Sequence, residues 1–299
     1  MPNKLSTHFL ASRPQFFSLS LVGMLLGIAS QSQTYVWWLN ALAILCVLFV
    51  HAGANLINDV ADEENGTDRI NEERITPFTG GSRFIQDQLL HIKEIRFSAY
   101  LCFGVAAVLG LIICSQRPQL VGIGLVGMVL AWGYSAKPLQ LNSRGLGEIA
   151  LFLSFGAIPF GFSLLSTSAT PANLCLAAYY GLQATAVLFL NQYPDRKADQ
   201  QAGKHHLVVR MGAGKATLLY LLMIQICFML LLAIASLSGN WLTISAALPL
   251  ILQLWCLLTL WKIKGNTAEM KPLIVANIAA AHIGTVLLAA SFSLINGIK

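Results

Sequence analysis

Charged residues are scarce in this 299-residue chain, where Asp, Glu, Lys and Arg together fill 11% of the positions. Soluble globular proteins carry about 25%, so this chain has too few charges to cover a surface that faces water. With 56% hydrophobic residues, the same scarcity excludes a disordered chain and a nucleic-acid-binding protein. What remains is a protein that crosses the lipid bilayer several times. We expect no nucleic acid and no protein partner.

Cysteine motifs are missing as well. The six cysteines include no C-x-x-C pair, and all of them lie in apolar segments, where cysteine serves as a small packing residue. This distribution excludes a disulfide scaffold and gives no support to a metal or redox role for the cysteines. Long alternation of polar and apolar residues is also absent, which disfavours a membrane β-barrel.

Apolar runs dominate what is present. Because the hydrocarbon core of a bilayer is about 30 Å thick, a helix needs roughly 20 apolar residues to cross it. Nine runs approach this length, at about 16–30, 35–57, 97–115, 119–136, 146–167, 172–193, 216–238, 241–261 and 273–295. The sequence therefore predicts an all-α polytopic membrane protein of about nine transmembrane helices, forming one domain over 1–299. Two four-helix halves, about 13–140 and 146–261, plus a ninth helix are a further hypothesis.

The positive charges predict how the chain is oriented. Of the 19 Lys and Arg residues, 17 lie in the N-terminal segment or after the second, fourth, sixth and eighth runs. Since Lys and Arg gather on the cytoplasmic side, we expect a cytoplasmic N-terminus and an external C-terminus, in a bacterial plasma (inner) membrane. The first run also has the form of a signal peptide, but Arg13-Pro14 abuts it closely, and its removal would leave the remaining topology unchanged.

The acidic residues are even more unevenly placed. All 13 fall on the predicted cytoplasmic side, and nine of them lie in the loop after the second run. These nine are Asp59, Asp62, Glu63, Glu64, Asp68, Glu72, Glu73, Asp87 and Glu94. Because acids contribute little to orientation, their clustering needs another cause, and chemistry at that face is the natural one.

A polar stripe enters this loop along the second predicted helix. It consists of His51, Asn55, Asn58 and Asp62, which fall within about 60° of one another at 100° per residue, with Asp59 beside them. Polar groups at such depth face a bundle interior or a wet cavity. Two carboxylates one turn apart can share a divalent cation, and Asp68, after a turn at Gly66, can add another oxygen. For His51 we favour a helix-packing role over a catalytic one.

A second stripe ends the sixth predicted helix. Asn191, Asp195 and Asp199 recur every four residues, which places them on one face if the helix continues. Pro194 is compatible with this if a new helical turn starts there. Both stripes emerge on the same side of the membrane, four crossings apart.

The two loops differ in charge in a way that suggests a ligand. The loop after the second run has five basic and nine acidic residues, whereas the loop after the sixth has two acidic and five basic ones, Arg196, Lys197, Lys204, Arg210 and Lys215. Facing carboxylates repel each other unless cations bridge them, and Mg²⁺ binds through one or two carboxylates plus substrate phosphates. Nearby Arg and Lys then bind the remaining phosphate oxygens. A prenyl diphosphate, with a charged head and an apolar tail, fits such a place best.

Other interpretations remain open at this level. Acidic loops at helix ends are often solvated caps, although two clusters, each introduced by an intramembrane asparagine, disfavour that. A cation transporter would use carboxylates as ion ligands, but transport sites usually lie near the bilayer midplane. A catalytically inactive scaffold is a third interpretation, against which the paired aspartates argue.

The two stripes resemble the aspartate-rich motifs of the UbiA superfamily of intramembrane aromatic prenyltransferases. Asn58-Asp59-x-x-Asp62-x-x-x-Gly66-x-Asp68 is similar to the first motif, in the spacing of the 1,4-dihydroxy-2-naphthoate polyprenyltransferase branch of menaquinone biosynthesis. Asp195-x-x-x-Asp199-x-x-x-Gly203-Lys204 is similar to the second. Shorter matching segments are Arg13-Pro14, Gly80-Gly81-Ser82, Tyr134 to Leu139, and Arg144 to Glu148. The likeness extends over about residues 13–215, and the last three helices match in hydrophobicity alone.

This resemblance implies a fold, a reaction and a set of roles. The helices would surround a central cavity, and Asp59, Asp62, Asp195 and Asp199 would be the catalytic residues and would hold Mg²⁺ on a polyprenyl diphosphate. The allylic C–O bond would ionise, and an electron-rich aromatic acceptor would attack the cation. The implied substrate-binding residues are Arg13, Asn55, Asn58, Asp68, Lys137, Arg144, Asn191 and Lys204. Gly80-Gly81-Ser82 either offers backbone N–H groups to a phosphate or breaks a helix.

Departures from the family pattern concern the acceptor. Gly66 stands where many members of the superfamily have an aspartate, which favours the naphthoate branch, and His205-His206 stands where Arg-Thr or Lys-Thr is common. We therefore expect dihydroxynaphthoate as acceptor, followed by another aromatic acid such as 4-hydroxybenzoate, and then a glycerol phosphate lipid.

Overall fold

The computed structural model describes residues 3–31, 36–166 and 169–298, and its regular structure in these ranges is entirely helical. The α-helices are α1 (Lys4–Ala11), α2 (Phe17–Ala29), α3 (Trp37–Asn65), α4 (Thr67–Ile70), α5 (Ile92–Gln116), α6 (Val121–Gly133), α7 (Gly147–Ser163), α8 (Pro171–Gln201), α9 (Leu207–Ser238), α10 (Leu250–Ile263) and α11 (Met270–Ile298). The predicted all-α class is confirmed.

Each of the nine predicted apolar runs falls on helical structure, but the helices differ in length. Among the described residues, six are long and apolar enough to cross a bilayer, and a seventh span results if the pair Lys4–Ala11 and Pro14–Ala29, bent by 46°, counts as one. The fourth and fifth runs correspond to the shorter helices Pro118–Gly133 and Gly147–Ser163. Two predicted limits, Tyr35 and Thr167, lie outside the described residues.

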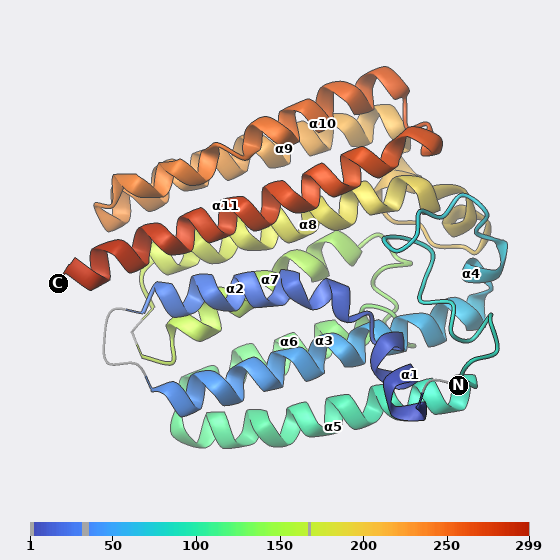
Figure 1. Ribbon diagram of the computed structural model, residues 1–299, viewed down its shortest axis with the longest axis horizontal. Coiled ribbons are helices and arrows are strands. Elements are labelled where there is room, and N and C mark those ends of the chain that lie inside the picture. Colours follow the sequence, from blue (N-terminus) through green and yellow to red (C-terminus); the bar gives the residue numbers. More distant parts are fainter. Residues whose placement is uncertain (1–2, 32–35, 167–168, 299) are drawn as a thin grey trace.

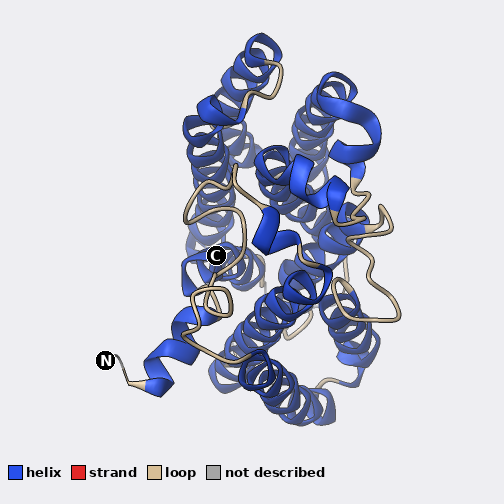
Figure 2. Ribbon diagram, turned by 90° about the vertical axis from the view of Figure 1, so that its right-hand side faces the viewer, coloured by secondary structure: helices blue, strands red, loops and turns tan. Residues whose placement is uncertain are grey.

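The long helices run side by side, and the functional loops gather at one end of the bundle (Figure 1). Packing is closest between α3 and α5, between α7 and α8, and between α8 and α9. At the end where α3 and α8 terminate lie α4 and the segment 71–91, which we call the roof loop; Figure 2 views the molecule from this end. We call this the mouth end. The division into two four-helix halves stays a prediction.

Both motif-bearing helices extend beyond the apolar runs predicted for them. Helix α3 continues for two turns past Ile57 and stops at Gly66, whose φ of 81° is the left-handed conformation that ends helices. Helix α8 continues through Pro194, which lies inside the helix, so the condition that the helix continues is met without a new helix starting at the proline. A proline inside a helix removes one backbone hydrogen bond, yet the face carrying Asp195 and Asp199 remains continuous. Each pair of aspartates therefore lies on a continuous helical end.

A buried polar network joins the last four α-helices, α8 to α11. At its centre, Asn277 Oδ1 accepts hydrogen bonds from Tyr220 Oη at 2.8 Å and from Gln253 Nε2 at 3.0 Å. Asn277 Nδ2 donates to the carbonyl of Ala186 at 2.8 Å, and Gln253 also donates to Gln183 at 2.8 Å. In hydrocarbon no water is available to hydrogen-bond these groups, so they must bond to one another. The network therefore holds α8, α9, α10 and α11 together.

Replacing Asn277 by leucine is expected to lower the free energy of unfolding by about 1–3 kcal/mol, because three buried polar partners lose their hydrogen bonds. Thermal unfolding of the purified protein in neutral bilayers measures the effect. The control is Thr285→Val on the same helix, whose hydroxyl donates to the Ala281 carbonyl one turn away. Equal loss in the two variants would contradict an interhelical role for Asn277.

Candidate active site

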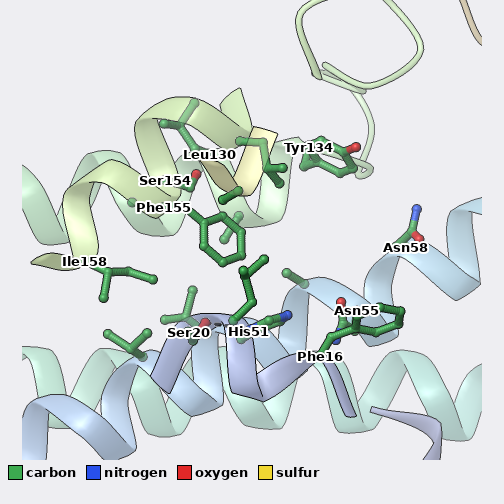
Figure 3. Close-up of a pocket in the computed structure, with 18 of the residues that line it drawn as sticks. Phe16, Ser20, His51, Asn55, Asn58, Leu130, Tyr134, Ser154, Phe155 and Ile158 are labelled. Carbon is green, nitrogen blue, oxygen red and sulfur yellow. Dashed lines mark hydrogen bonds between the residues drawn. The ribbon is translucent and has the colours of Figure 1, made fainter. Parts of the chain in front are cut away.

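A cavity of about 650 Å³ opens at the mouth end and extends between α2, α3, α5, α6, α7 and α8. Its deep part is apolar, and Figure 3 shows the ring of Phe155 on α7 pointing toward His51 on α3. His51 Nδ1 lies 2.7 Å from Ser20 Oγ, a helix-to-helix contact. Asn55 and Asn58 follow along α3 toward Tyr134 (Figure 3). At 1.5 Å per residue, His51 lies roughly 16 Å deeper along α3 than Asp62, so the polar stripe leads from the mouth inward.

Asp59, the first motif aspartate, is held by two groups. Its Oδ1 forms an ion pair with Arg13 and accepts a hydrogen bond from the backbone N–H of Ser82 at 3.4 Å. Arg13 reaches it because the chain bends between α1 and α2, where Arg13 itself adopts a φ of 57°. Asp59 is buried and lies behind the cavity wall rather than on it. Arg13 and the roof loop therefore both bind to Asp59 of the first motif.

Lys204 joins the two motifs. Its Nζ lies 2.5 Å from Asp62 Oδ1 on α3 and 3.3 Å from Asp199 Oδ1 on α8. Asp199 also contacts His206 Nε2 at 3.1 Å, and all four side chains are buried. Burial on its own would lower the pKa of Lys204, but the two carboxylates raise it above its ordinary value. The ammonium therefore stays charged between them.

Two further residues, Asn71 and Asp68, lie at the mouth. Asn71, from the roof loop, donates through Nδ2 to Asp195 Oδ1 at 2.7 Å. Asp68 is buried, and Arg83 binds its backbone carbonyl. Burial, together with the nearby Asp62 carboxylate, raises the pKa of Asp68 to about 7. A cation at this place would favour the ionised form of Asp68, because an opposite charge stabilises a carboxylate.

The structure brings most of the predicted residues to the cavity; the exceptions are Asp59, which lies behind the wall, and Lys137 and Arg144. Arg13, Asn55, Asn58, Asp68, Asn191 and Lys204 line it, together with Asp62, Asp195 and Asp199. Lys137 and Arg144 are exposed and lie outside the lining, and Arg144 donates to the Pro138 carbonyl at 2.8 Å. Their substrate contact stays a prediction that this geometry does not favour.

Sequence reasoning missed Asn71 and Thr79 of the roof loop, which also line the cavity. No helical spacing connects these residues with the motifs, since they lie on a loop folded back over the helix ends. The only available signal was the neighbouring Gly80-Gly81-Ser82, for which the sequence left two roles open, phosphate binding through backbone N–H groups or breaking a helix. Both glycines have positive φ and belong to a loop, so they do not interrupt a helix.

The donor set suits a hard cation such as Mg²⁺. Within the described part of the chain, no three His, Cys, Asp or Glu side chains are close enough to hold one metal ion by themselves. However, buried oxygens without a hydrogen-bond partner point to missing ligands; they are Asp59 Oδ2, Asp68 Oδ2, Asn71 Oδ1 and Asn191 Oδ1. Mg²⁺ typically uses one or two carboxylates plus substrate phosphates, which fits two opposed pairs better than a closed metal cage.

A family model described as the UbiA prenyltransferase family matches residues 17–280. The chain belongs to this family. It is therefore an enzyme, a prenyltransferase embedded in the membrane by several helices, and the transporter interpretation does not hold. The resemblance read from the two aspartate motifs is confirmed.

Individual relatives agree with this assignment. A 1,4-dihydroxy-2-naphthoate octaprenyltransferase of Haemophilus influenzae is 28% identical over 245 residues, covering 78% of each chain. Among solved structures, a UbiA homologue of Aeropyrum pernix superimposes with a TM-score of 0.71 at 14% identity over the full length of both chains. A homologue of Archaeoglobus fulgidus bound to DMAPP and Mg²⁺ has a TM-score of 0.68 at 14% identity, covering 94% of this chain and 99% of that one. These structures share the fold of this prenyltransferase.

Gly81 permits the prenyltransferase to place Asp68 at the mouth. A Cβ atom at Gly81 would lie 2.1 Å from Asp68 Oδ2, whereas at Gly66, which has a similar positive φ, it would meet nothing within 4 Å. Both alanine variants carry backbone strain of about 1 kcal/mol, but only Gly81→Ala displaces the carboxylate. We expect Gly81→Ala to lower the rate of prenyl transfer at least tenfold more than Gly66→Ala does. Equal rates in the two variants would contradict a role for Asp68 at the mouth.

Proposed function

We propose that this enzyme transfers a prenyl group from a polyprenyl diphosphate to 1,4-dihydroxy-2-naphthoate in a Mg²⁺-dependent reaction of menaquinone biosynthesis. The single observation that carries the proposal is the meeting of both aspartate motifs across Lys204 at the mouth of an apolar cavity. The mouth can accommodate the charged diphosphate of the substrate, and the cavity its apolar prenyl chain. We further propose that this mouth faces the cytoplasm of a bacterial plasma membrane, as the distribution of Lys and Arg predicts.

The four motif aspartates, Asp59, Asp62, Asp195 and Asp199, are the residues that would hold Mg²⁺ on the diphosphate. Bound there, Mg²⁺ supplies positive charge that stabilises the departing diphosphate. The protein adds its own positive charges. Lys204 and Arg13 lie beside the same carboxylates, and when the diphosphate binds they can donate hydrogen bonds to its phosphate oxygens instead. Asn71 and Asn191 offer further polar contacts at the same mouth.

Once the allylic C–O bond ionises, the two electrons leave with the diphosphate oxygen and an allylic cation remains. The apolar cavity keeps water away from this cation, and the rings of Phe155 and Tyr134, both of which line the cavity, offer electron-rich faces to it. The acceptor ring then forms the new C–C bond, and with a naphthoate acceptor its carboxylate is lost as CO₂. Burial of the prenyl tail contributes about 0.8 kcal/mol per CH₂, which holds the substrate in place for the reaction.

Two observations support dihydroxynaphthoate as acceptor. The first motif has the Gly66-x-Asp68 spacing of the naphthoate branch, and the relative from Haemophilus influenzae carries a dihydroxynaphthoate name. 4-Hydroxybenzoate and a glycerol phosphate lipid are the alternatives that an experiment has to distinguish.

The test is an assay of membranes that contain the expressed protein, with radiolabelled prenyl diphosphate and each of the three acceptors in turn. We expect labelled lipid product with dihydroxynaphthoate, complete loss of product when EDTA removes Mg²⁺, and recovery when Mg²⁺ is added back. Membranes without the expressed protein are the control. Product with 4-hydroxybenzoate or a glycerol phosphate lipid but not with dihydroxynaphthoate would reassign the acceptor, and product that survives chelation would contradict the metal dependence.

A further inference from the structure

A second, smaller cavity of about 230 Å³ lies at the mouth end, on another face of α8. We call it the basic pocket. Its wall includes Glu73 of the roof loop, Arg196 and Lys197 of α8, and Lys264 and Thr267 of the turn between α10 and α11. Arg196 is turned by 100° around α8 from Asp195, and it does not line the large cavity. The basic pocket is therefore separate from the candidate active site.

The charges of the basic pocket are unbalanced in favour of an anion. Its one carboxylate, Glu73, already forms an ion pair with Lys197. The side chains of Arg196 and Lys264 form no ion pair or hydrogen bond within the part of the chain that the structure describes, so two positive charges remain without a partner. The neighbouring hydroxyl of Thr267 is a further donor. This set of donors matches a phosphate, which accepts several hydrogen bonds from Arg and Lys.

The pocket is built by a tight turn rather than by loose surface chains. Gly265 has a φ of 77°, and a Cβ there would come within 3.2 Å of the Tyr193 ring. The turn therefore packs directly on Tyr193, whose hydroxyl donates to the Ala213 carbonyl at 3.3 Å. Lys264 precedes this glycine with a φ of 50° and lines the pocket together with Arg196 and Lys197 of α8.

The level of the pocket relative to the membrane indicates the source of the phosphate. Three large apolar side chains of α10 face outward: Trp255 is 45% exposed, Leu258 61% and Trp261 58%. Such a surface belongs in lipid, and tryptophan near a helix end marks the membrane interface. Helix α10 ends at Ile263, so Lys264 lies where the chain leaves the hydrocarbon, at the depth of phospholipid headgroups. Basic pockets between transmembrane helices at this level bind anionic headgroups.

We propose that the basic pocket binds the phosphate of an anionic phospholipid between Arg196 and Lys264. The bound headgroup links α8 to the α10–α11 turn beside the Lys197–Glu73 pair, which ties the roof loop to α8. The same loop contains Asn71, which donates a hydrogen bond to Asp195. The bound lipid therefore stabilises the loop that covers the active site. This inference does not depend on which acceptor the enzyme uses.

The experiment compares the double variant Arg196→Gln/Lys264→Gln with a matched control, Lys262→Gln/Lys271→Gln. The control removes two exposed lysines of the same region that do not line the pocket. Each protein is placed in nanodiscs of phosphatidylcholine, alone or mixed with phosphatidylglycerol. Thermal unfolding midpoints are measured, and phosphatidylglycerol molecules that remain bound are counted by native mass spectrometry. Inorganic phosphate added to phosphatidylcholine nanodiscs forms a separate arm.

We expect phosphatidylglycerol to raise the unfolding midpoint of the unchanged protein and of the control variant by roughly 2–4 °C, with one molecule retained. The pocket variant should show neither effect, although its midpoint in phosphatidylcholine alone matches that of the unchanged protein. If that midpoint falls, retention in the mass spectra decides. Equal loss of retention in both double variants would overturn the proposal by showing diffuse attraction to a charged surface. A shift with inorganic phosphate but not with phosphatidylglycerol, absent in the pocket variant, would keep the anion site and overturn the lipid as its occupant.

Discussion

Replacing either Asp62 or Asp199 by asparagine will lower the rate of prenyl transfer by about 10²–10³-fold or more, the size of effect seen when a preorganised electrostatic group is removed from an active site. Asparagine keeps the shape of the side chain but removes the negative charge that a Mg²⁺–diphosphate complex requires. The loss should appear mainly in kcat/KM for the prenyl diphosphate, because the ground state and the transition state both lose the metal. Initial rates in membranes at saturating acceptor measure it.

The loop itself supplies the control for these variants. Asp87 lies on the roof loop, where it is exposed and outside the cavity lining, so Asp87→Asn removes a negative charge near the mouth without changing a residue of the site. We expect it to retain full activity. Comparable losses for Asp87→Asn and Asp62→Asn would mean that overall negative charge at the mouth end, and not a specific site, supports the reaction.

Replacing Lys204 by methionine has the second largest expected effect, because it acts on both stability and catalysis. Without the ammonium, Asp62 and Asp199 are left buried beside each other, and breaking a buried ion pair by removing one partner costs about 3–5 kcal/mol of unfolding free energy. The diphosphate also loses a direct donor, so the KM for the prenyl diphosphate should rise by about tenfold or more. Thermal unfolding and steady-state kinetics measure the two effects separately.

Two further variants distinguish the role of Lys204 from simple loss of charge. Lys204→Arg keeps the charge and should recover most of the unfolding free energy. Lys215→Met removes an exposed lysine of α9 and should change neither quantity. The loss of stability in Lys204→Met should shrink when Mg²⁺ is present together with a prenyl thiodiphosphate, since the metal then neutralises the carboxylates. A midpoint equal to that of the unchanged protein would contradict the placement of Lys204 between the motifs.

Much of the fold follows from the sequence because the bilayer imposes a strong length rule. Each apolar run had to become a helix in order to satisfy its backbone in hydrocarbon, and the placement of Lys and Arg predicted how the runs alternate. What the runs could not show is where a helix ends once it leaves the lipid. Helices α3 and α8 continue beyond Ile57 and Tyr193, because capping and tertiary packing, not hydropathy, decide that point.

The candidate site was predictable where helical periodicity applies. Asn55, Asn58 and Asp62 share a face at any reasonable helix geometry, as do Asn191, Asp195 and Asp199. Contacts made by loops were not predictable in this way: the bonds of Asn71 to Asp195 and of Ser82 to Asp59 depend on how the roof loop folds back. Lys137 and Arg144 are a different case, because their contact with substrate stays a prediction. Positive charges beside a membrane helix occur for reasons of orientation, and sequence alone does not separate those from ligand contacts.

The most direct test of the central claim, that both motifs hold one metal-bound diphosphate, is a double-mutant cycle on binding. Affinity for a non-hydrolysable prenyl thiodiphosphate is measured with Mg²⁺ for the unchanged protein, Asp62→Asn, Asp199→Asn and the double variant. Residues that act on one ligand as a unit are strongly non-additive. We therefore expect the double variant to bind little worse than either single one. Free-energy losses that simply add, or an affinity that one substitution leaves unchanged, would show that the two motifs do not share the ligand.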